Sequence, residues 1–275
     1  MANVLVTGCS SGFGLLTALR FARAGDRVLA TMRTPAKAPR ELAAAVEERL
    51  SIRVARLDVC DQASVDAAVR EAGDVDVLVN NAGIELRSSI EDATPDDVHK
   101  QFDTNVFGTL RVIRAVLPRM RSRRTGTIVN VSSIAGLVAR PYGGYYSASK
   151  HALEAISEAL HFEVHPFGVR VVLIEPGQYG TRLLDNAFPG AGFTSKSPYW
   201  AYSERFDERL VRLRPGGEMA DPAEVANLIY DAVHDPAPKL RYLAGEDAHM
   251  IATAYKQMDF EQYEQMMRQS LDWRD

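Results

Sequence analysis

The chain has 275 residues, 46% of them hydrophobic, and a net charge of -4. This is enough apolar material for one large core, and the acidic balance argues against a general affinity for nucleic acid. No apolar run approaches the roughly 18 residues that a membrane-spanning helix needs, and MANVLVTG carries no features of a secretory signal. Because the two cysteines, Cys9 and Cys60, provide no disulfide framework, we expect a cytoplasmic protein.

Strand patterns alternate with helix patterns along the chain. Continuous apolar runs are typical of parallel strands that are covered on both faces. The alternation predicts one α/β domain over residues 1–275, a Rossmann-like doubly wound parallel β-sheet of about seven strands with helices on both faces. Ligands should then bind beyond the carboxyl ends of the strands. Strands are expected at 3–7, 27–32, 52–59, 75–80, 126–132, 169–176 and 239–245, and helices at 15–25, about 41–50, 62–73, 97–120, 145–164 and 221–235.

A glycine-rich turn, TGCSSGFG at 7–14, follows the first expected strand and precedes the first expected helix. Glycines at Gly8, Gly12 and Gly14 allow a tight turn and a close approach of the backbone to a pyrophosphate. The spacing is GxxxGxG rather than GxGxxG, so the position at the first strand–helix junction carries more weight than the letters. We expect a dinucleotide-binding site here.

Three rival motifs have less support. Residues 8–12 also match the G-x-S-x-G nucleophile elbow, but that turn belongs in mid-sheet with an oxyanion-hole loop upstream. Residues 147–150 match S-x-x-K without the companion motifs S-D-N and K-T-G. His161 and His165 share a helix face but lack a third ligand, so we expect no metal site.

The end of the second expected strand bears on the choice of cofactor. A carboxylate there would hold the ribose hydroxyls of NAD, whereas a cation would hold the 2′-phosphate of NADP. The sequence places Met32 and Arg33 at this point, with Lys37 nearby and no acid. Arg33, helped by the Ser10 hydroxyl, would pair with the phosphate, and the sequence therefore favours NADP(H) over NAD(H).

Three tyrosines, at 142, 145 and 146, lie at the start of an expected helix. Only Tyr146 has a lysine four residues later, at Lys150, on the same helix face. An ammonium about 4 Å from a phenol contributes about 4 kcal/mol at an effective dielectric near 20, so the spacing predicts a lowered phenol pKa. Ser133, at the end of the fifth expected strand, offers a hydroxyl that could hold a substrate oxygen.

In this order and spacing the motifs resemble the short-chain dehydrogenase/reductase family from Val4 to about Thr181, with weaker similarity to about Gly245. The residues of the first turn and of the end of the second expected strand are similar to those of NADP-preferring members such as hydroxysteroid and retinol dehydrogenases. The motifs are TGCSSGFG, Asp58-Val59, NNAG at 80–83, Asn105, Ser133, YSASK at 146–150 and PGQYGT at 176–181.

The resemblance implies a catalytic set. Ser133 would orient the substrate oxygen, Tyr146 would act as general acid or base, and Lys150 would lower the Tyr146 pKa and bind the nicotinamide ribose. Asn105 would hold a water in a proton relay. The residues and the resemblance together predict cofactor contacts at Gly8, Ser10, Ser11, Gly12, Phe13, Gly14, Arg33, Asp58, Val59, Asn81, Ala82, Gly83, Tyr146, Lys150, Pro176, Gly177, Tyr179 and Thr181.

Two of these residues depart from the family pattern. Phe13 stands where an aliphatic residue is usual, and Tyr179 where valine or isoleucine follows the PG pair. Both positions mainly offer backbone N–H groups, so we expect an altered shape near the nicotinamide rather than lost binding.

The function expected from this set is transfer of a hydride between NADP(H) and a small-molecule secondary alcohol or ketone, with a medium or large apolar substrate. Aromatic residues among glycines and prolines at 182–220 suggest a mobile substrate-binding lid. The resemblance also implies a homodimer or homotetramer formed by the helices at 97–120 and 145–164. The alternative is a catalytically silent regulatory protein that senses nucleotides on the same fold.

Overall fold

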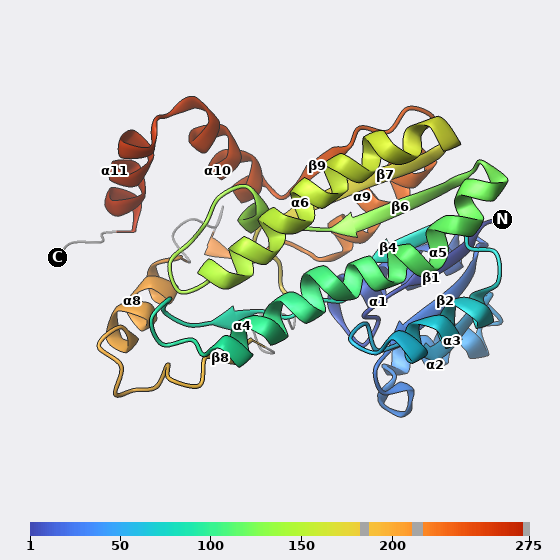
Figure 1. The fold of residues 1–275 in the computed structure, drawn as a ribbon, viewed down its shortest axis with the longest axis horizontal. Helices are drawn as coiled ribbons and strands as arrows, with labels where there is room; N and C mark the ends of the chain where they lie inside the picture. The colour runs from blue at the N-terminus through green and yellow to red at the C-terminus, as the bar shows by residue number, and fades with distance from the viewer. Residues whose placement is uncertain (182–186, 211–216, 272–275) are drawn as a thin grey trace.

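The structure is a computed structural model, and it describes residues 1–181, 187–210 and 217–271. A parallel sheet of seven strands forms its centre (Figure 1), which confirms the predicted fold class. The strand order reverses between β1 and β4, where a doubly wound sheet binds its ligands. In spatial order the strands are β3 (Ile52–Arg56), β2 (Arg27–Met32), β1 (Asn3–Val6), β4 (Val77–Asn80), β6 (Gly126–Val131), β7 (Val169–Pro176) and β9 (Arg241–Ala244).

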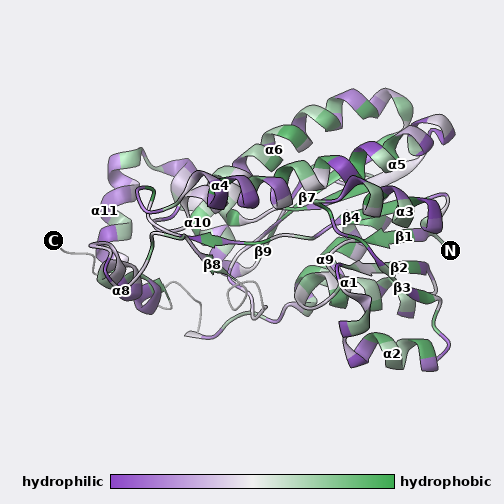
Figure 2. Ribbon diagram, turned by 60° about the horizontal axis from the view of Figure 1, so that its bottom comes forward, coloured by the Kyte–Doolittle hydropathy of each residue, from purple (hydrophilic) through white to green (hydrophobic). Residues whose placement is uncertain are grey.

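Helices cover both faces of this sheet. One face packs against α1, α2 and α9, and the other against α3, α5 and α6. Much of the sheet is green in Figure 2 because most of the strand residues are apolar, as is typical of parallel strands buried on both faces. The helices are α1 (Gly12–Arg23), α2 (Arg40–Glu47), α3 (Gln62–Ala72), α4 (Pro95–Phe102), α5 (Thr109–Arg123), α6 (Gly144–Val164), α8 (Trp200–Leu210), α9 (Ala223–His234), α10 (Glu246–Gln257) and α11 (Phe260–Ser270).

Some elements were not expected from the sequence. A two-stranded parallel ribbon joins β5 (Leu86–Arg87) to β8 (Phe188–Pro189). The single helix expected at 97–120 is divided into α4 and α5 by a wider π-helical turn, η2 (Asp103–Gly108). Helices α10 and α11 follow the last strand. Among the described residues, no helix combines the length and apolarity needed to cross a membrane.

Close backbone contact locks the glycine-rich turn to the loop after β4. The Asn81 side chain donates hydrogen bonds to the carbonyl oxygens of Thr7 and Gly8, at 2.9 and 3.2 Å. A methyl group at Gly14 would lie 2.4 Å from Asn81 Nδ2 and 2.5 Å from Gly8 O. Gly8 itself has a φ of +74°, a conformation that glycine adopts without strain. The close contacts at Gly14 leave no room for a side chain, so glycine is needed there for packing behind the turn.

Candidate functional site

A cavity of about 890 Å³ lies at the carboxyl edge of the sheet. The loops after β1, β4, β6 and β7 all contribute to its wall, as expected for a doubly wound sheet. Of the predicted site residues, Asn105 and Gly14 do not line it. The others do: Gly8, Ser10, Ser11, Gly12, Phe13, Arg33, Asp58, Val59, Asn81, Ala82, Gly83, Ser133, Tyr146, Lys150, Pro176, Gly177, Tyr179 and Thr181.

The glycine-rich turn leads directly into α1 and forms one end of the cavity. Ser11 is the N-cap residue, its side chain makes no capping hydrogen bond, and the first turn of α1 contains no acidic residue. The first N–H groups of a helix have no partner within it, and the helix dipole favours an anion there. Gly12, with a φ of +57°, packs against Thr181, which brings the loop after β7 to this turn. The geometry fits a pyrophosphate.

Arg33 follows β2 at the same end of the cavity. Its side chain is exposed, and within the described ranges no hydrogen bond or ion pair engages it. Lys37, in a short turn (Pro35–Lys37), also lines the cavity. An exposed guanidinium beside a cavity can bind a phosphate in a bidentate manner.

The four catalytic candidates come from three parts of the chain, and three of them meet at the other end of the cavity. Tyr146 and Lys150 lie one turn apart on α6, and both are buried. The Lys150 ammonium lies 5.7 Å from the centroid of the Tyr146 ring and donates a 2.8 Å hydrogen bond to Val131 O. The Ser133 hydroxyl lies close enough to the Tyr146 phenol to lower its pKa. A carbonyl oxygen placed here could receive bonds from both hydroxyls.

The other two tyrosines have different surroundings. The Tyr145 hydroxyl donates a 3.1 Å hydrogen bond to Ile90 O near the surface. The Tyr142 ring stacks on Phe193, with centroids 6.1 Å apart. Only Tyr146 of the three lines the cavity.

The protonation of this group differs from the expectation. Burial raises the pKa of the Tyr146 phenol, Glu85 raises it further, and the Ser133 hydrogen bond and Arg140 only partly oppose this. The predicted lowering of the phenol pKa is therefore wrong for this arrangement, because desolvation of the phenolate outweighs the contacts that favour it. Burial lowers the pKa of Lys150 to about 8, although Glu154 and Glu85 oppose that shift. Near neutral pH the phenol is protonated and the ammonium still mostly charged.

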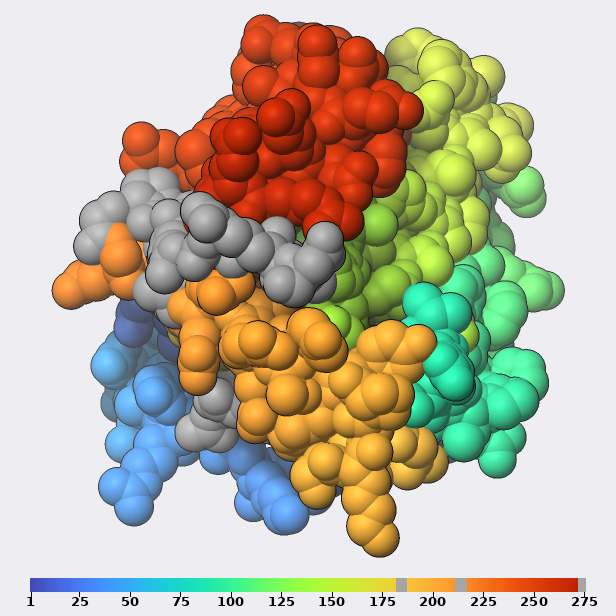
Figure 3. Space-filling view, turned by 90° about the vertical axis from the view of Figure 1, so that its left-hand side faces the viewer, coloured from blue at the N-terminus to red at the C-terminus, as the bar shows by residue number. Residues whose placement is uncertain are grey.

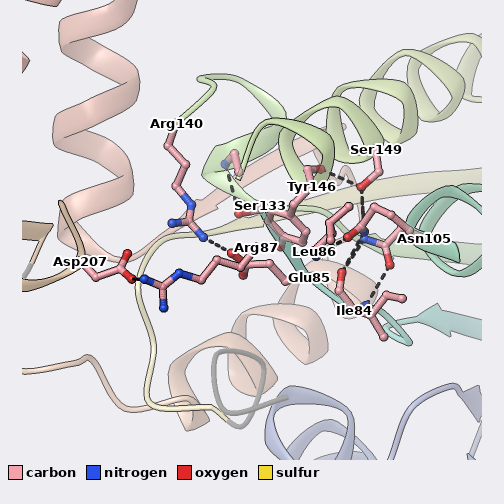
Figure 4. A network of polar contacts seen from close by, with 12 residues as sticks. Ile84, Glu85, Leu86, Arg87, Asn105, Ser133, Arg140, Tyr146, Ser149 and Asp207 are labelled. Atoms are coloured by element: carbon pink, nitrogen blue, oxygen red, sulfur yellow. Dashed lines mark hydrogen bonds and ion pairs between the residues drawn. The ribbon is translucent and has the colours of Figure 1, made fainter. Parts of the chain in front are cut away.

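Asn105 lies behind the cavity wall, in the π-helical turn η2. Its Nδ2 donates to Ile84 O at 3.0 Å and to Ser149 Oγ at 3.1 Å, and its Oδ1 accepts from Ile84 N at 2.9 Å. These bonds use both N–H donors of the amide. The side chain thus fixes the backbone at Ile84 (Figure 4) rather than presenting donors to a water in the cavity.

The two departures from the family pattern contact each other. The Phe13 and Tyr179 rings lie 5.4 Å apart in an edge-to-face arrangement, and the Tyr179 hydroxyl donates to Glu224 at 2.9 Å. Next to them, Gln178 N donates a 2.7 Å hydrogen bond to the buried Asp247 carboxylate of α10. The loop after β7 is therefore held from both sides in the shape that lines the cavity.

Part of the cavity wall was not predicted from the sequence. Glu85, two residues after NNAG, and Arg140, between Ser133 and Tyr146, both line the cavity and form an ion pair. An acidic residue between the apolar Ile84 and Leu86 was the available signal for Glu85, whereas Arg140 stands in a loop without a periodic pattern.

The C-terminal helices were also missed. They contribute Ile251, Phe260, Tyr263, Met267 and Leu271 to the wall. Asp259 and Gln262 form a capping box at the start of α11, and this D-x-x-Q pattern was a readable signal for a helix. Figure 3 shows the C-terminal helices (red) and α8 (orange) covering the same side of the molecule. The predicted lid at 182–220 lies partly outside the described residues, and α8 is the part of it that contributes Phe206 and Leu210.

A second buried cluster lies behind Lys150. Arg241 of β9 contacts Glu154 of α6 at 3.2 Å, Glu175 of β7 at 3.3 Å and the half-exposed Glu158 at 2.7 Å. Burial and the neighbouring Glu154 carboxylate raise the pKa of Glu175 to about 8, although Arg241 opposes the shift. Two buried carboxylates beside one guanidinium cannot both ionise readily, so Glu175 retains a proton at neutral pH.

The two histidines considered as metal ligands lie on α6 and in the turn after it, with ring centroids 6.3 Å apart. In the part of the chain that the structure describes, no group of three or more potential ligand side chains was found.

Comparison with known proteins gives consistent matches over most of the chain. Residues 2–191 match the family model described as short chain dehydrogenase. The chain is 43% identical over 250 residues to the uncharacterized oxidoreductase YusZ of Bacillus subtilis, with 88% of each chain covered. It is 40% identical over 258 residues to retinol dehydrogenase 8 of Bos taurus, covering 87% of this chain and 80% of the relative. It is 36% identical over 254 residues to human 17-beta-hydroxysteroid dehydrogenase type 1, covering 88% and 77%.

Solved structures share the fold over nearly the whole chain. A short-chain dehydrogenase from Streptomyces avermitilis has a TM-score of 0.81 at 35% identity, covering 99% of this chain and 98% of the other. A Burkholderia phymatum structure in complex with NAD has a TM-score of 0.80 at 26% identity, covering 96% and 94%. A gluconate 5-dehydrogenase from Burkholderia cenocepacia, in complex with NADP and tartrate, has a TM-score of 0.75 at 26% identity, covering 90% and 94%.

The Glu175 carboxyl predicts a pH dependence of stability. Its folded pKa of about 8 exceeds the ordinary 4.5, so the folded state binds a proton that the unfolded state releases between these values. The stability that Glu175 contributes is present below about pH 4.5 and is lost as the pH rises to about 8. Glu175→Gln should remove this decline. The unfolding free energies of parent and variant, measured with denaturant from pH 5 to 8.5, should then differ in slope by up to about 1.4 kcal/mol per pH unit.

Glu158→Gln is the matched control, because Glu158 contacts the same arginine but is 52% exposed. It should leave the slope close to that of the parent. If the unfolding free energies of the parent and of Glu175→Gln changed with pH in parallel, the assignment of the proton to Glu175 would be contradicted.

Proposed function

Because the chain belongs to the short-chain dehydrogenase family, we propose that it transfers hydride between NADP(H) and a secondary alcohol or ketone. Members of this family are oxidoreductases, and solved relatives bind NAD or NADP. The observation that carries the proposal is the meeting of Tyr146, Ser133 and Lys150 at one end of a cavity whose other end fits a pyrophosphate.

The catalytic roles follow from the positions of these three side chains. When bound, a nicotinamide cofactor supplies or accepts the hydride. Tyr146 donates its phenolic proton to the carbonyl oxygen during reduction and takes it back during oxidation. Ser133 holds the same oxygen through its hydroxyl. Lys150 carries positive charge one helix turn from the phenol, which stabilises the phenolate that reduction leaves behind.

The raised pKa of the Tyr146 phenol suits this role in the direction of reduction. A phenol that remains protonated at neutral pH is in the form that donates a proton to a carbonyl oxygen. Oxidation of an alcohol requires the phenolate instead, and is favoured at higher pH.

The assignment of NADP(H) depends on Arg33. The end of β2 carries this exposed arginine, Lys37 lies nearby, and the residues between them are uncharged. A 2′-phosphate needs such a cation, whereas the ribose hydroxyls of NAD are usually held by a carboxylate. The remaining predicted contacts, from the glycine-rich turn to Thr181, are proposed to hold the rest of the cofactor.

The substrate is proposed to be medium-sized or large and apolar, since the cavity continues past Tyr146 between apolar residues of α8 and α11. The names of the retinol and hydroxysteroid relatives are consistent with a substrate of this kind. A cytoplasmic location, expected from the cysteine content, remains part of this proposal. Cys9 is buried and Cys60 is exposed, and neither forms a disulfide.

Arg33→Ala tests the choice of cofactor. The variant should bind NADPH roughly 10- to 100-fold more weakly than the parent, because a charge-assisted contact to the 2′-phosphate is lost. Binding of NADH should change little. Nicotinamide fluorescence titrations measure both constants, with Arg40→Ala as a control for an exposed arginine that does not line the cavity. A parent that prefers NADH would overturn the assignment.

Tyr146→Phe tests the catalytic assignment. Loss of the proton donor should lower kcat by about 10²- to 10⁴-fold while the cofactor still binds. Tyr145→Phe removes a hydroxyl from the same helix turn that, among the described residues, bonds to Ile90 O, and this variant should retain most of the parent's turnover. Steady-state rates on a panel of apolar ketones provide the measurement. Equal rates for the parent and Tyr146→Phe, or cofactor binding without turnover in the parent, would favour the nucleotide-sensing alternative.

A homodimer or homotetramer is also proposed, through α5 and α6. The side chain of Phe162 on α6 is 70% exposed, and that of Phe107 beside α5 is 51% exposed. Large apolar side chains on the outer face of two adjacent helices are typical of an interface between subunits. Light scattering of the purified chain should give at least twice the mass of 30.3 kDa, and a monomer at micromolar concentration would contradict this.

A further inference from the structure

Two ion pairs lie in succession between the candidate catalytic tyrosine and α8 (Figure 4). Glu85 pairs with Arg140, and Arg87 pairs with Asp207 of α8. Glu85 and Arg140 line the cavity, whereas Arg87 and Asp207 do not. Both members of the first pair are close enough to Tyr146 to change its pKa. The first pair is thus a polar element of the wall where a substrate would react.

The Glu85 carboxylate is held firmly. The backbone on either side of it is bonded by side-chain amides: Asn105 bonds both the N–H and the carbonyl oxygen of Ile84, and Gln101 accepts from Leu86 N at 2.6 Å. Glu85 itself is 3% exposed. A carboxylate buried to this degree needs a partner, and Arg140 provides it. Glu85 therefore serves to fix the position of the guanidinium.

Arg140 is the member of the pair that reaches the cavity. Its side chain is 25% exposed, and its guanidinium lies over Gly143, three residues before Tyr146: a methyl group at Gly143 would be 3.0 Å from Arg140 Nε. A guanidinium has five N–H donors, and Glu85 is its one hydrogen-bond partner among the described residues. The remaining donors are available to an oxygen of a bound substrate.

Beyond this pair the wall becomes apolar. Phe206 and Leu210 of α8 cluster there with Met267 of α11 and with Leu271, and the Tyr142 ring packs against them from outside the wall. The charges on this part of the wall are those of the Glu264–Arg268 pair of α11, which is half-exposed. A substrate that fills both parts would carry oxygen near its reacting carbon and an apolar portion farther away. The opposite placement would leave apolar groups against the ion pair.

We propose that Arg140, positioned by Glu85, is a specificity-determining residue that binds a second, uncharged oxygen of the substrate. This rests on the proposed function and deepens it. The preferred substrates are ketones that bear an ester, carbonyl or hydroxyl oxygen a few bonds from the reacting carbonyl, together with an apolar chain. An uncharged oxygen is favoured over a carboxylate because Glu85 already balances the charge of Arg140, and a second carboxylate would face Glu85 across a buried site.

The test compares three substrates whose apolar chains have the same length: a γ-keto methyl ester, the free γ-keto acid and the plain ketone. With NADPH, the parent should use the ester with a higher kcat/KM than either of the others. Arg140→Met keeps the length of the side chain but removes its donors. It should lower the ratio of kcat/KM for ester over plain ketone by roughly 10- to 100-fold. Arg87→Met is the matched control, since Arg87 does not line the cavity, and it should preserve the ratio.

Glu85→Gln provides a second readout, which a merely structural role would not produce. With the carboxylate gone, the charge of Arg140 is no longer balanced, so the preference should move from the ester toward the keto acid. Glu85→Gln/Arg140→Met, which leaves no buried unpaired charge, should show neither preference. An unchanged ester-to-ketone ratio in Arg140→Met, or a parent that prefers the keto acid, would overturn the proposal.

Binding measurements separate this proposal from the proposed function. Dissociation constants of the three compounds for the NADPH-bound protein can be obtained by calorimetry whether or not turnover occurs. Tighter binding of the ester in the parent and its loss in Arg140→Met would support the role of Arg140, even if no hydride transfer were detected. Equal binding of ester and plain ketone by the parent would overturn it, even if both were reduced.

Discussion

The parallel pairing of β1, β4, β6 and β7 is the constraint on which the site depends. In this register the four strands end at one edge, and hydrogen bonds continue beyond them: Thr7 N donates to Val79 O, and Ser132 N to Ile174 O. The glycine-rich turn and the loops after the other three strands must then lie side by side. The backbone hydrogen bonds between the strands fix the position of each loop. The cavity therefore forms without each side chain having to find its distant neighbours separately.

Buried polar contacts extend this register to the helix that carries the catalytic candidates. Asn80 Nδ2 of β4 donates to Asn130 Oδ1 of β6 at 2.9 Å, and Asn130 Nδ2 donates to Ser157 Oγ of α6 at 2.8 Å. Amides buried in a sheet cost free energy unless they are paired, so α6 has few alternative positions along the sheet. The Tyr146 phenol and the Lys150 ammonium, one and two turns into this helix, are aligned with the ends of the strands as a result.

The sequence predicted the fold and the strand-end loops of the cavity wall because both depend on local patterns. Seven apolar runs matched the seven strands of the sheet, and candidate site residues marked the ends of six of them. What it could not predict depends on contacts between distant segments. The pairing of Glu85 with Arg140 joins residues 55 positions apart. Likewise, the spacing of Tyr146 and Lys150 revealed their proximity but not the depth of burial that raises the phenol pKa.

The position of α10 and α11 has a consequence for biosynthesis. These helices, together spanning Glu246 to Ser270, are the last described elements of the chain, yet they form part of the cavity wall, and Asp247 supports the loop after β7. A nascent chain can pair all seven strands once β9 has left the ribosome, while this wall is still inside the exit tunnel. The sheet can therefore be complete before the substrate side of the cavity exists, and the last helices close a site that the rest of the fold has already prepared.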